Sequence, residues 1–340
     1  MVFDTMPVVA TPALHPAPDL AALRIGVVHN PGSGVNLRTP AAMSRAFGNH
    51  PEIPRRDVKD PDSVVRALDE LAAQEVNTLA VSGGDGTVRA VLDALLARKP
   101  FQRQPLLAVL RAGTTNMIAG DAGMCGPPDI ALASLIERAA HGGEGLDIVQ
   151  RKILRIDPGS GQAPIYGMFF GAAMISQGVE YCKSKVHSVG LRGEIGPGVT
   201  LLRFVVAMAR GDRDIVRPVP VSVSIDGAVA TASDCGVMLV TSLERLFLGL
   251  RPFWGEEDTP LHFSFARAQP RYWLRALPGI LRGRRNRFMT SANGYVSHNV
   301  HRLQLGLDSP FIVDGEFFSP VPGSPLVLTD GGAMDFLRLR

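Results

Sequence analysis

The sequence has few cysteines, no long apolar run and little excess charge. Its three cysteines, Cys125, Cys182 and Cys235, are odd in number, far apart and without metal-ligand spacing, so we expect small core residues in a reducing compartment. The longest apolar runs, such as residues 166–175, reach about half the length of a membrane-spanning helix. The first residues carry an acid, no basic leader and repeated prolines, which disfavours a secretory signal. These absences predict a cytoplasmic protein without a transmembrane segment.

The net charge is only +3 and is carried mostly by arginine. Arginine holds phosphate through a two-pronged guanidinium, so the charge suits an anionic partner. Because the charge is modest and forms no long run, the sequence argues against a dedicated nucleic-acid binder.

Length and texture predict two globular domains. The chain has 340 residues, which is more than a single hydrophobic core usually holds together. Hydrophobic residues make up 46% and charged residues 20%, as in an ordinary globular protein. Short apolar runs alternate with helical stretches in the first part and predict a parallel sheet, whereas later runs alternate apolar and polar residues and predict antiparallel strands. We expect a disordered tail over 1–20, an α/β domain over 21–145 and a β-sandwich domain over 146–340.

Three glycine-rich loops follow the predicted parallel strands: "NPGSG" at 30–34, "SGGDGT" at 82–87 and "RAGTTN" at 111–116. In open α/β sheets, ligands bind at the carboxyl ends of the strands. Glycine turns at helix N-termini present free backbone N–H groups to an anion, so these loops predict a phosphate site. Neither a Walker motif nor a complete dinucleotide fingerprint is present, which disfavours a P-loop kinase and a standard dinucleotide fold.

Asp85 is an acid inside one of these phosphate-binding loops. A carboxylate there repels phosphate unless a cation lies between them, so Asp85 is predicted to engage Mg²⁺ directly or through water. The alternative is an ordinary turn aspartate.

The loops together resemble the diacylglycerol kinase catalytic family, which includes bacterial lipid kinases, sphingosine kinases and ceramide kinases. The resemblance rests on Asn30-Pro31 with Ser33-Gly34, on Gly83-Gly84-Asp85-Gly86-Thr87, and on Gly113-Thr114 with Asn116. It continues in "GLRPFWGEEDTPLHFSFA" and in "VDGEFF", and covers roughly residues 24 to 320.

The resemblance implies that residues 21–145 form a nucleotide-binding α/β domain like that of NAD kinase and diacylglycerol kinase, and that residues 146–340 form a C-terminal antiparallel β-sandwich for the lipid substrate. It also implies transfer of the γ-phosphate of ATP to the hydroxyl of a diacylglycerol or of a ceramide or sphingoid lipid. It implies ATP and Mg²⁺ as cofactors. The implied catalytic residues are Glu316, Asp314 and Asp85, and the implied metal ligands are Asp258 and Asp85. The implied nucleotide-binding residues are Asn30, Pro31, Gly32, Ser33, Gly34, Gly83, Gly84, Asp85, Gly86, Thr87, Gly113, Thr114 and Asn116.

Several positions depart from the family pattern. Arg89-Ala90 replaces the frequent Asn-Glu, Arg111 replaces a proline, and Met117 stands where many members have aspartate. Thr259 takes the place of a glycine beside Asp258, which puts the structural Mg²⁺ site in question.

Residues 270–288 combine six arginines with aromatic and aliphatic side chains. This composition is typical of a segment that lies on anionic lipid, and equally of a surface helix that packs on the sandwich. The lipid interpretation predicts a peripheral protein at the inner membrane face. Two other functions stay open, a soluble NAD kinase and a non-catalytic nucleotide or lipid sensor, and the sequence leaves a homodimer open.

Overall fold

The computed structural model describes residues 19–180 and 217–339. Most of the predicted tail, residues 1–18, and Cys182 lie outside the described residues. Cys235 is a buried core residue as expected, but Cys125 is exposed, so the core prediction is wrong for that cysteine. In the part of the chain that is described, no helix has the length and apolar character needed to cross a bilayer.

The first region is an α/β domain with a parallel sheet in the order β2-β1-β3-β4. Its strands are β1 (Ile25–His29), β2 (Arg55–Asp57), β3 (Thr78–Gly83) and β4 (Leu106–Arg111). Its helices are η1 (Leu20–Ala22), α1 (Gly34–Arg38), α2 (Pro40–Asn49), α3 (Pro61–Ala73), α4 (Asp85–Arg98), α5 (Met117–Ala122) and α6 (Pro128–Ala140). Strands β1 and β3 are buried throughout, which explains their continuous apolar runs.

Helix boundaries follow local chemistry. Helix α3 begins at Pro61 after Asp60, whose side chain accepts a hydrogen bond from the Ser63 backbone N–H in a capping box. Helix α4 begins at Asp85, directly after the glycines that end β3. The strand, glycine loop and helix order predicted for this region is therefore confirmed.

The second region consists of antiparallel strands. They are β5 (Leu146–Asp157), β6 (Ile165–Gly167), β7 (Phe169–Ala173), β8 (Val219–Ile225), β9 (Thr231–Thr241), β10 (Leu261–Arg267), β11 (Tyr295–Val300), β12 (Arg302–Leu307), β13 (Phe311–Val313), β14 (Glu316–Phe318) and β15 (Leu326–Leu339). Short helices η2 (Phe247–Gly249), α9 (Trp273–Arg282) and η3 (Ser291–Asn293) interrupt them. The strand order is β14-β13-β7-β9-β8-β12-β15, and β10 and β11 extend from β9. The predicted fold class, parallel α/β followed by antiparallel β, is confirmed.

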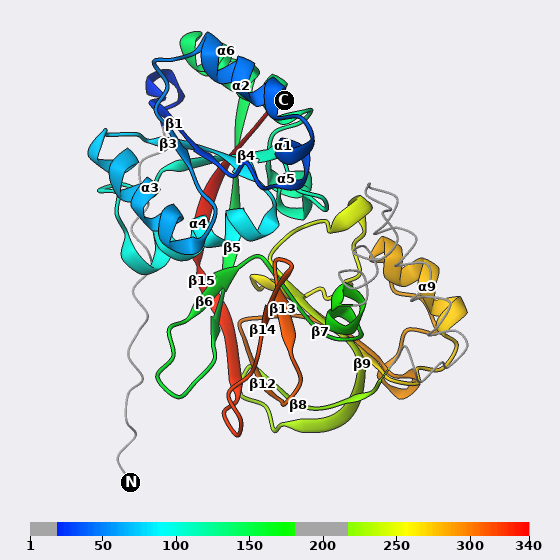
Figure 1. The fold of residues 1–340 in the computed structure, drawn as a ribbon. Helices are drawn as coiled ribbons and strands as arrows, with labels where there is room; N and C mark the ends of the chain where they lie inside the picture. Colours follow the sequence, from blue (N-terminus) through cyan, green and yellow to red (C-terminus); the bar gives the residue numbers. More distant parts are fainter. Residues whose placement is uncertain (1–18, 181–216, 340) are drawn as a thin grey trace.

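Two long strands, β5 and β15, connect the regions (Figure 1). They pair with each other in antiparallel fashion from Asp157 with Val327 to Leu146 with Leu339. At its far end β15 also pairs in parallel with β4, where Phe336 lies opposite Leu107. The end of the chain thus returns to the α/β region, and the predicted domain boundary at 145 and 146 stays a prediction.

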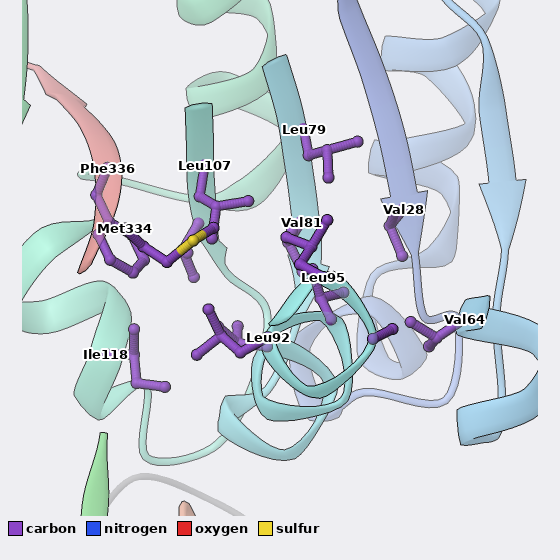
Figure 2. Packing of buried hydrophobic residues seen from close by; sticks show 14 of the residues in the cluster. Val28, Val64, Leu79, Val81, Leu92, Leu95, Leu107, Ile118, Met334 and Phe336 are labelled. Atoms are coloured by element: carbon purple, nitrogen blue, oxygen red, sulfur yellow. The ribbon is translucent and has the colours of Figure 1, made fainter. Parts of the chain in front are cut away.

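The parallel sheet has an apolar core on each face. Val28, Val81 and Leu107 point to the face covered by α3, α4 and α5, and the residues next to them point to the face covered by α2 and α6. Met334 and Phe336 of β15 pack into the first of these cores, beside Leu107 (Figure 2). A third core lies among the antiparallel strands. The nucleotide-binding region predicted from residues 21–145 is therefore completed by β15.

We predict that Phe336→Ala lowers the free energy of unfolding by about 3–5 kcal/mol, because Phe336 is fully buried and its loss leaves a cavity under β4. Chemical denaturation followed by circular dichroism measures the change. Val229→Ala, at a side chain that is 90% exposed, is the matched control and should change little. An unchanged stability of Phe336→Ala would show that β15 does not support the first region.

Candidate active site

The three glycine loops lie side by side at one edge of the parallel sheet. The strands that precede them, β1, β3 and β4, are neighbours and run in the same direction, so their carboxyl ends meet. We call residues 30–34 the first loop, residues 83–87 the second loop and residues 113–116 the third loop. The structure brings every predicted nucleotide-binding residue to this edge.

Side-chain hydrogen bonds join the first and second loops. The Ser33 hydroxyl oxygen accepts a bond from the Gly84 backbone N–H at 3.2 Å. The Asn30 side-chain amide donates to the Thr87 hydroxyl at 2.9 Å, and its oxygen accepts from the Gly32 N–H at 2.9 Å. Asn36, which sequence reasoning did not single out, is buried and donates to the Asn30 carbonyl at 2.8 Å. The polar residues of the first loop thus fix its distance from the second.

Close backbone contacts explain the glycines. A Cβ on Gly113 would lie 2.5 Å from Cα of Gly84, and a Cβ on Gly34 would lie 3.0 Å from the Thr114 hydroxyl oxygen. Larger residues would therefore push the three loops apart. Asn116 closes the third loop in the left-handed conformation, with its side-chain oxygen accepting from the Gly113 N–H at 2.7 Å.

Asp85 joins the second loop to α5. Its two carboxylate oxygens accept hydrogen bonds from the backbone N–H groups of Met117, at 3.1 Å, and Ile118, at 3.0 Å. Burial raises the pKa of this carboxyl, while the two backbone hydrogen bonds lower it. The acid in the glycine loop therefore has a structural role that the sequence did not reveal, because its partners lie more than thirty residues away in the chain.

The second region contributes the hairpin between β13 and β14. Asp314 and Gly315 both have positive φ, 47° and 86°, as the tight turn of a two-residue hairpin requires. The Asp314 carboxyl is buried and accepts bonds from the Met168 and Phe169 N–H groups, each at 2.9 Å. Burial raises the pKa of Asp314, and the negative charge of Asp85 raises it further, whereas the two backbone hydrogen bonds lower it. Together these effects bring the pKa of Asp314 to about 8.

Glu316 faces the second loop from this hairpin. It is the first residue of β14, its side chain is exposed, and a Cβ on Gly86 would lie 2.7 Å from its Oε1. A carboxylate from the antiparallel region thus lies against the glycine loop of the α/β region. The two predicted halves of the site, from distant parts of the chain, come together.

One face of α4 carries residues that the sequence reasoning did not assign to the site. Arg89 and Asp93 follow Asp85 at four-residue intervals and form an ion pair with each other. Asp93 also accepts a hydrogen bond from the Tyr166 N–H at 2.6 Å, and the Arg89 guanidinium lies 5.2 Å from the centre of the Phe318 ring. Burial raises the pKa of Asp93. The spacing on α4 was the available signal, since it places all three charges on one face.

A buried ion pair makes a second connection near the site. Arg151 of β5 contacts Asp121 of α5 through Nε at 2.8 Å, and its Nη1 lies 3.3 Å from Glu244. Asp121 is buried, so this pair is shielded from solvent and holds α5 against the second region.

Asp258 is the predicted site residue for which no contact with the three loops is found among the described residues, so its role stays a prediction. It lies on an exposed loop before β10, and no hydrogen bond or ion pair joins it to another described residue. Its neighbour Glu257 instead accepts from the Asn299 N–H at 2.8 Å and contacts His298 at 2.6 Å. Within residues 19–180 and 217–339, no group of three His, Cys, Asp or Glu side chains could hold a metal ion by itself.

Comparison with solved structures supports the fold over nearly the whole chain. Three similar structures are from Bacillus anthracis strain Sterne; each is described as a diacylglycerol kinase, two of them provisionally. Their sequences are 17%, 15% and 18% identical to this chain, and the TM-scores are 0.59, 0.55 and 0.56. Each alignment covers 93% of this chain and 96% of the other. At these identities the likeness concerns the fold alone.

Comparison of sequences identifies the first region. No curated protein sequence matches the chain. Residues 24–146 match the family described as the diacylglycerol kinase catalytic domain, and this segment contains all three loops. The family that residues 24–146 match is thus the one that the glycine loops resemble.

Proposed function

We propose that the protein is an ATP-dependent lipid kinase that transfers the γ-phosphate of ATP to the hydroxyl of a membrane lipid of the diacylglycerol or ceramide and sphingoid type. One observation carries the proposal: the Glu316 carboxylate lies against Gly86, at the point where the three glycine loops converge. Phosphoryl transfer requires a nucleotide held in place and a carboxylate near the attacking hydroxyl, and this arrangement offers both.

The loops fit a triphosphate. Gly34, Gly84 and Gly113 allow backbone contacts that a Cβ would block, so backbone N–H groups can approach phosphate oxygens closely. Residues 30–34, 83–87 and 113–116 would hold the nucleotide. When bound, ATP supplies the transferred phosphoryl group, and Mg²⁺ neutralises charge on its oxygens.

Mg²⁺ commonly takes one or two carboxylates together with phosphate oxygens, so a cluster of three acidic side chains is not needed. Asp85 is the carboxylate that would hold it here, directly or through water. Each Asp85 oxygen accepts one backbone hydrogen bond and keeps a free lone pair. A second, structural Mg²⁺ at Asp258 stays a hypothesis drawn from the family resemblance.

Glu316 is our candidate for the general base, because it is exposed and faces the second loop, whereas Asp314 is buried with both oxygens engaged. Glu316 would accept the proton of the lipid hydroxyl. Asp314 would keep its own proton near neutral pH and so hold the hairpin without adding a second negative charge beside Asp85.

An apolar cluster next to the carboxylates favours a lipid acceptor. Phe169, Leu239 and Ile312 form its buried part, and Met117 and Phe317 pack against it. Met117 donates to Asp85, Phe169 donates to Asp314, and Phe317 follows Glu316 in the chain. Acyl or sphingoid chains suit such surroundings, whereas the ribose and charged groups of NAD do not.

An assay with radiolabelled ATP and Mg²⁺ tests the function. The acceptors are short-chain diacylglycerol, ceramide, sphingosine and NAD, each presented separately. We expect label in one of the lipids. Label in NAD alone would establish the soluble kinase, and no label in any acceptor despite ATP binding would support the sensor function; either result contradicts the proposal.

We predict that Glu316→Gln lowers kcat by about 10²- to 10⁴-fold, because the amide cannot accept the hydroxyl proton. The variant should remain folded, since Glu316 is exposed, and its KM for ATP should change little. Steady-state kinetics on the active lipid measure both. Glu144→Gln, at an exposed glutamate outside the site, is the matched control. A variant with nearly normal kcat would remove Glu316 from the chemistry.

Asp314 should make the folded protein less stable as pH rises. Its pKa is about 8 when folded and about 4 in an unfolded chain, so between these values the folded state holds a proton that the unfolded state has lost. The free energy of unfolding should therefore fall by up to about 1.4 kcal/mol per pH unit from this group. Asp314→Asn should remove that slope. Urea denaturation at pH 5, 6, 7 and 8 compares the proteins, and equal slopes in both would contradict the assignment.

A further inference from the structure

Helix α9 has an inner face that packs on the antiparallel region. Ala276 is fully buried against Met289 and Tyr295, and Trp254, Trp273 and Ile280 pack around them. Gly279 is buried as well, with its backbone against the Arg284 carbonyl. These contacts attach α9 to the body of the protein without using its outer face.

The outer face of α9 is apolar too. Leu274, Pro278 and Leu281 are spaced by four and three residues, so they form one stripe along the helix. At about 100° per residue, this stripe lies on the side of the helix opposite to Ala276. Leu274 is 67% exposed, and Tyr272, just before the helix, is 54% exposed. The stripe is therefore not explained by packing within the described chain.

Six arginines lie on α9 or next to it in the chain. Arg271, Arg275, Arg282, Arg284, Arg285 and Arg287 are all exposed. Across the described ranges, no ion pair joins any of the six to a carboxylate. The sequence also contains no Asp or Glu between Asp258 and Asp308. We call these six arginines, with Tyr272, Leu274, Pro278 and Leu281, the α9 patch.

The α9 patch is connected to the candidate active site. The Arg251 N–H donates to the Leu281 carbonyl at 3.2 Å, which ties the loop after β9 to the end of α9. On that loop, Leu248 of η2 is 72% exposed with φ of 58°, and η2 itself contacts α5. Helix α5 in turn receives the Asp85 hydrogen bonds. Figure 1 shows α9 on the side of the antiparallel region away from β6 and β15.

We infer that the α9 patch docks on an anionic phospholipid bilayer, with Leu274, Pro278 and Leu281 entering the interface and the arginines binding lipid phosphates. Exposed aliphatic side chains fit the apolar part of this partner, and exposed arginines with no carboxylate partner among the described residues fit its phosphates. Nucleic acid would use the charge but gains little from aliphatic side chains, since bases stack on aromatic rings. The inference deepens the proposed function by naming the surface that meets the membrane, and it is tested without ATP.

Vesicle sedimentation with the full chain tests the inference. Vesicles of phosphatidylcholine alone are compared with vesicles containing phosphatidylglycerol, at low and high salt. We expect binding to the anionic vesicles that weakens as salt rises, because screening reduces the arginine contribution. Equal binding to neutral and anionic vesicles, or none to either, would overturn the inference.

Two double variants separate the contributions. Arg284→Gln with Arg285→Gln should weaken binding about 25-fold, at about fivefold per basic residue near an anionic surface. Leu274→Ser with Leu281→Ser should weaken it by about tenfold or more through lost apolar burial. Arg66→Gln with Arg103→Gln, at exposed arginines elsewhere, and Ile130→Ser, at a side chain that is 61% exposed, are the matched controls. Controls that lose as much binding as the α9 variants would overturn the inference.

Tryptophan emission gives a readout that needs no variant. The chain has two tryptophans: Trp273 is the first residue of α9, and Trp254 packs with it in the cluster under the inner face of α9. Docking through the α9 patch should produce energy transfer from them to dansyl-labelled lipid headgroups. Bound protein without energy transfer would overturn the inference. A preference of the full chain for single-stranded nucleic acid over anionic vesicles, lost on substitution of Arg284 and Arg285, would also overturn it. Loss of vesicle binding leaves the kinase assay on short-chain lipid unaffected, so the two proposals fail separately.

Discussion

The contact between Glu316 and Gly86 is the constraint on which the arrangement of this molecule depends. It requires a glycine at position 86 of the second loop, because a side chain there would occupy the space of the Glu316 carboxylate. It also requires the hairpin of β13 and β14 to be held firmly, which Asp314 does by accepting two backbone hydrogen bonds from the segment that leads into β7. Finally, it requires the two regions to keep their relative position, and the paired strands β5 and β15 run through both of them.

Helix α4 connects these requirements. Its first residue, Asp85, accepts hydrogen bonds from the first two residues of α5, which follows the third loop. Further along the same face, Arg89 contacts Phe318 and Asp93 contacts Tyr166 of the antiparallel region. Charges on this face are partly buried and therefore interact more strongly than they would in water. The glycine loops and the hairpin of β13 and β14 are thus attached to one helix, which suits the proposed reaction because phosphoryl transfer depends on positioning.

The sequence allowed prediction of local features and of motifs. Apolar runs predicted the parallel strands, and alternating apolar and polar residues predicted the antiparallel strands; both predictions are confirmed. The glycine loops do lie together, but the phosphate site stays a prediction. The partners of Asp85 could not be predicted, because backbone N–H groups far along the chain leave no local pattern. The pairing of β15 with β4 could not be predicted either, because it joins residues that are more than 200 positions apart in the chain. For residues 270–288 the composition was typical both of a lipid-binding segment and of a helix packed on the protein. The structure shows a helix that has a packed face and, opposite to it, an exposed apolar face. Composition alone cannot assign residues to these two faces.

A crystal structure of the chain with a non-hydrolysable ATP analogue and Mg²⁺ tests the central claim most directly. The account predicts the triphosphate against residues 30–34, 83–87 and 113–116, with the Glu316 carboxylate directed toward the γ-phosphate. A triphosphate bound away from these loops, or a hairpin that turns Glu316 away from the γ-phosphate, would contradict it.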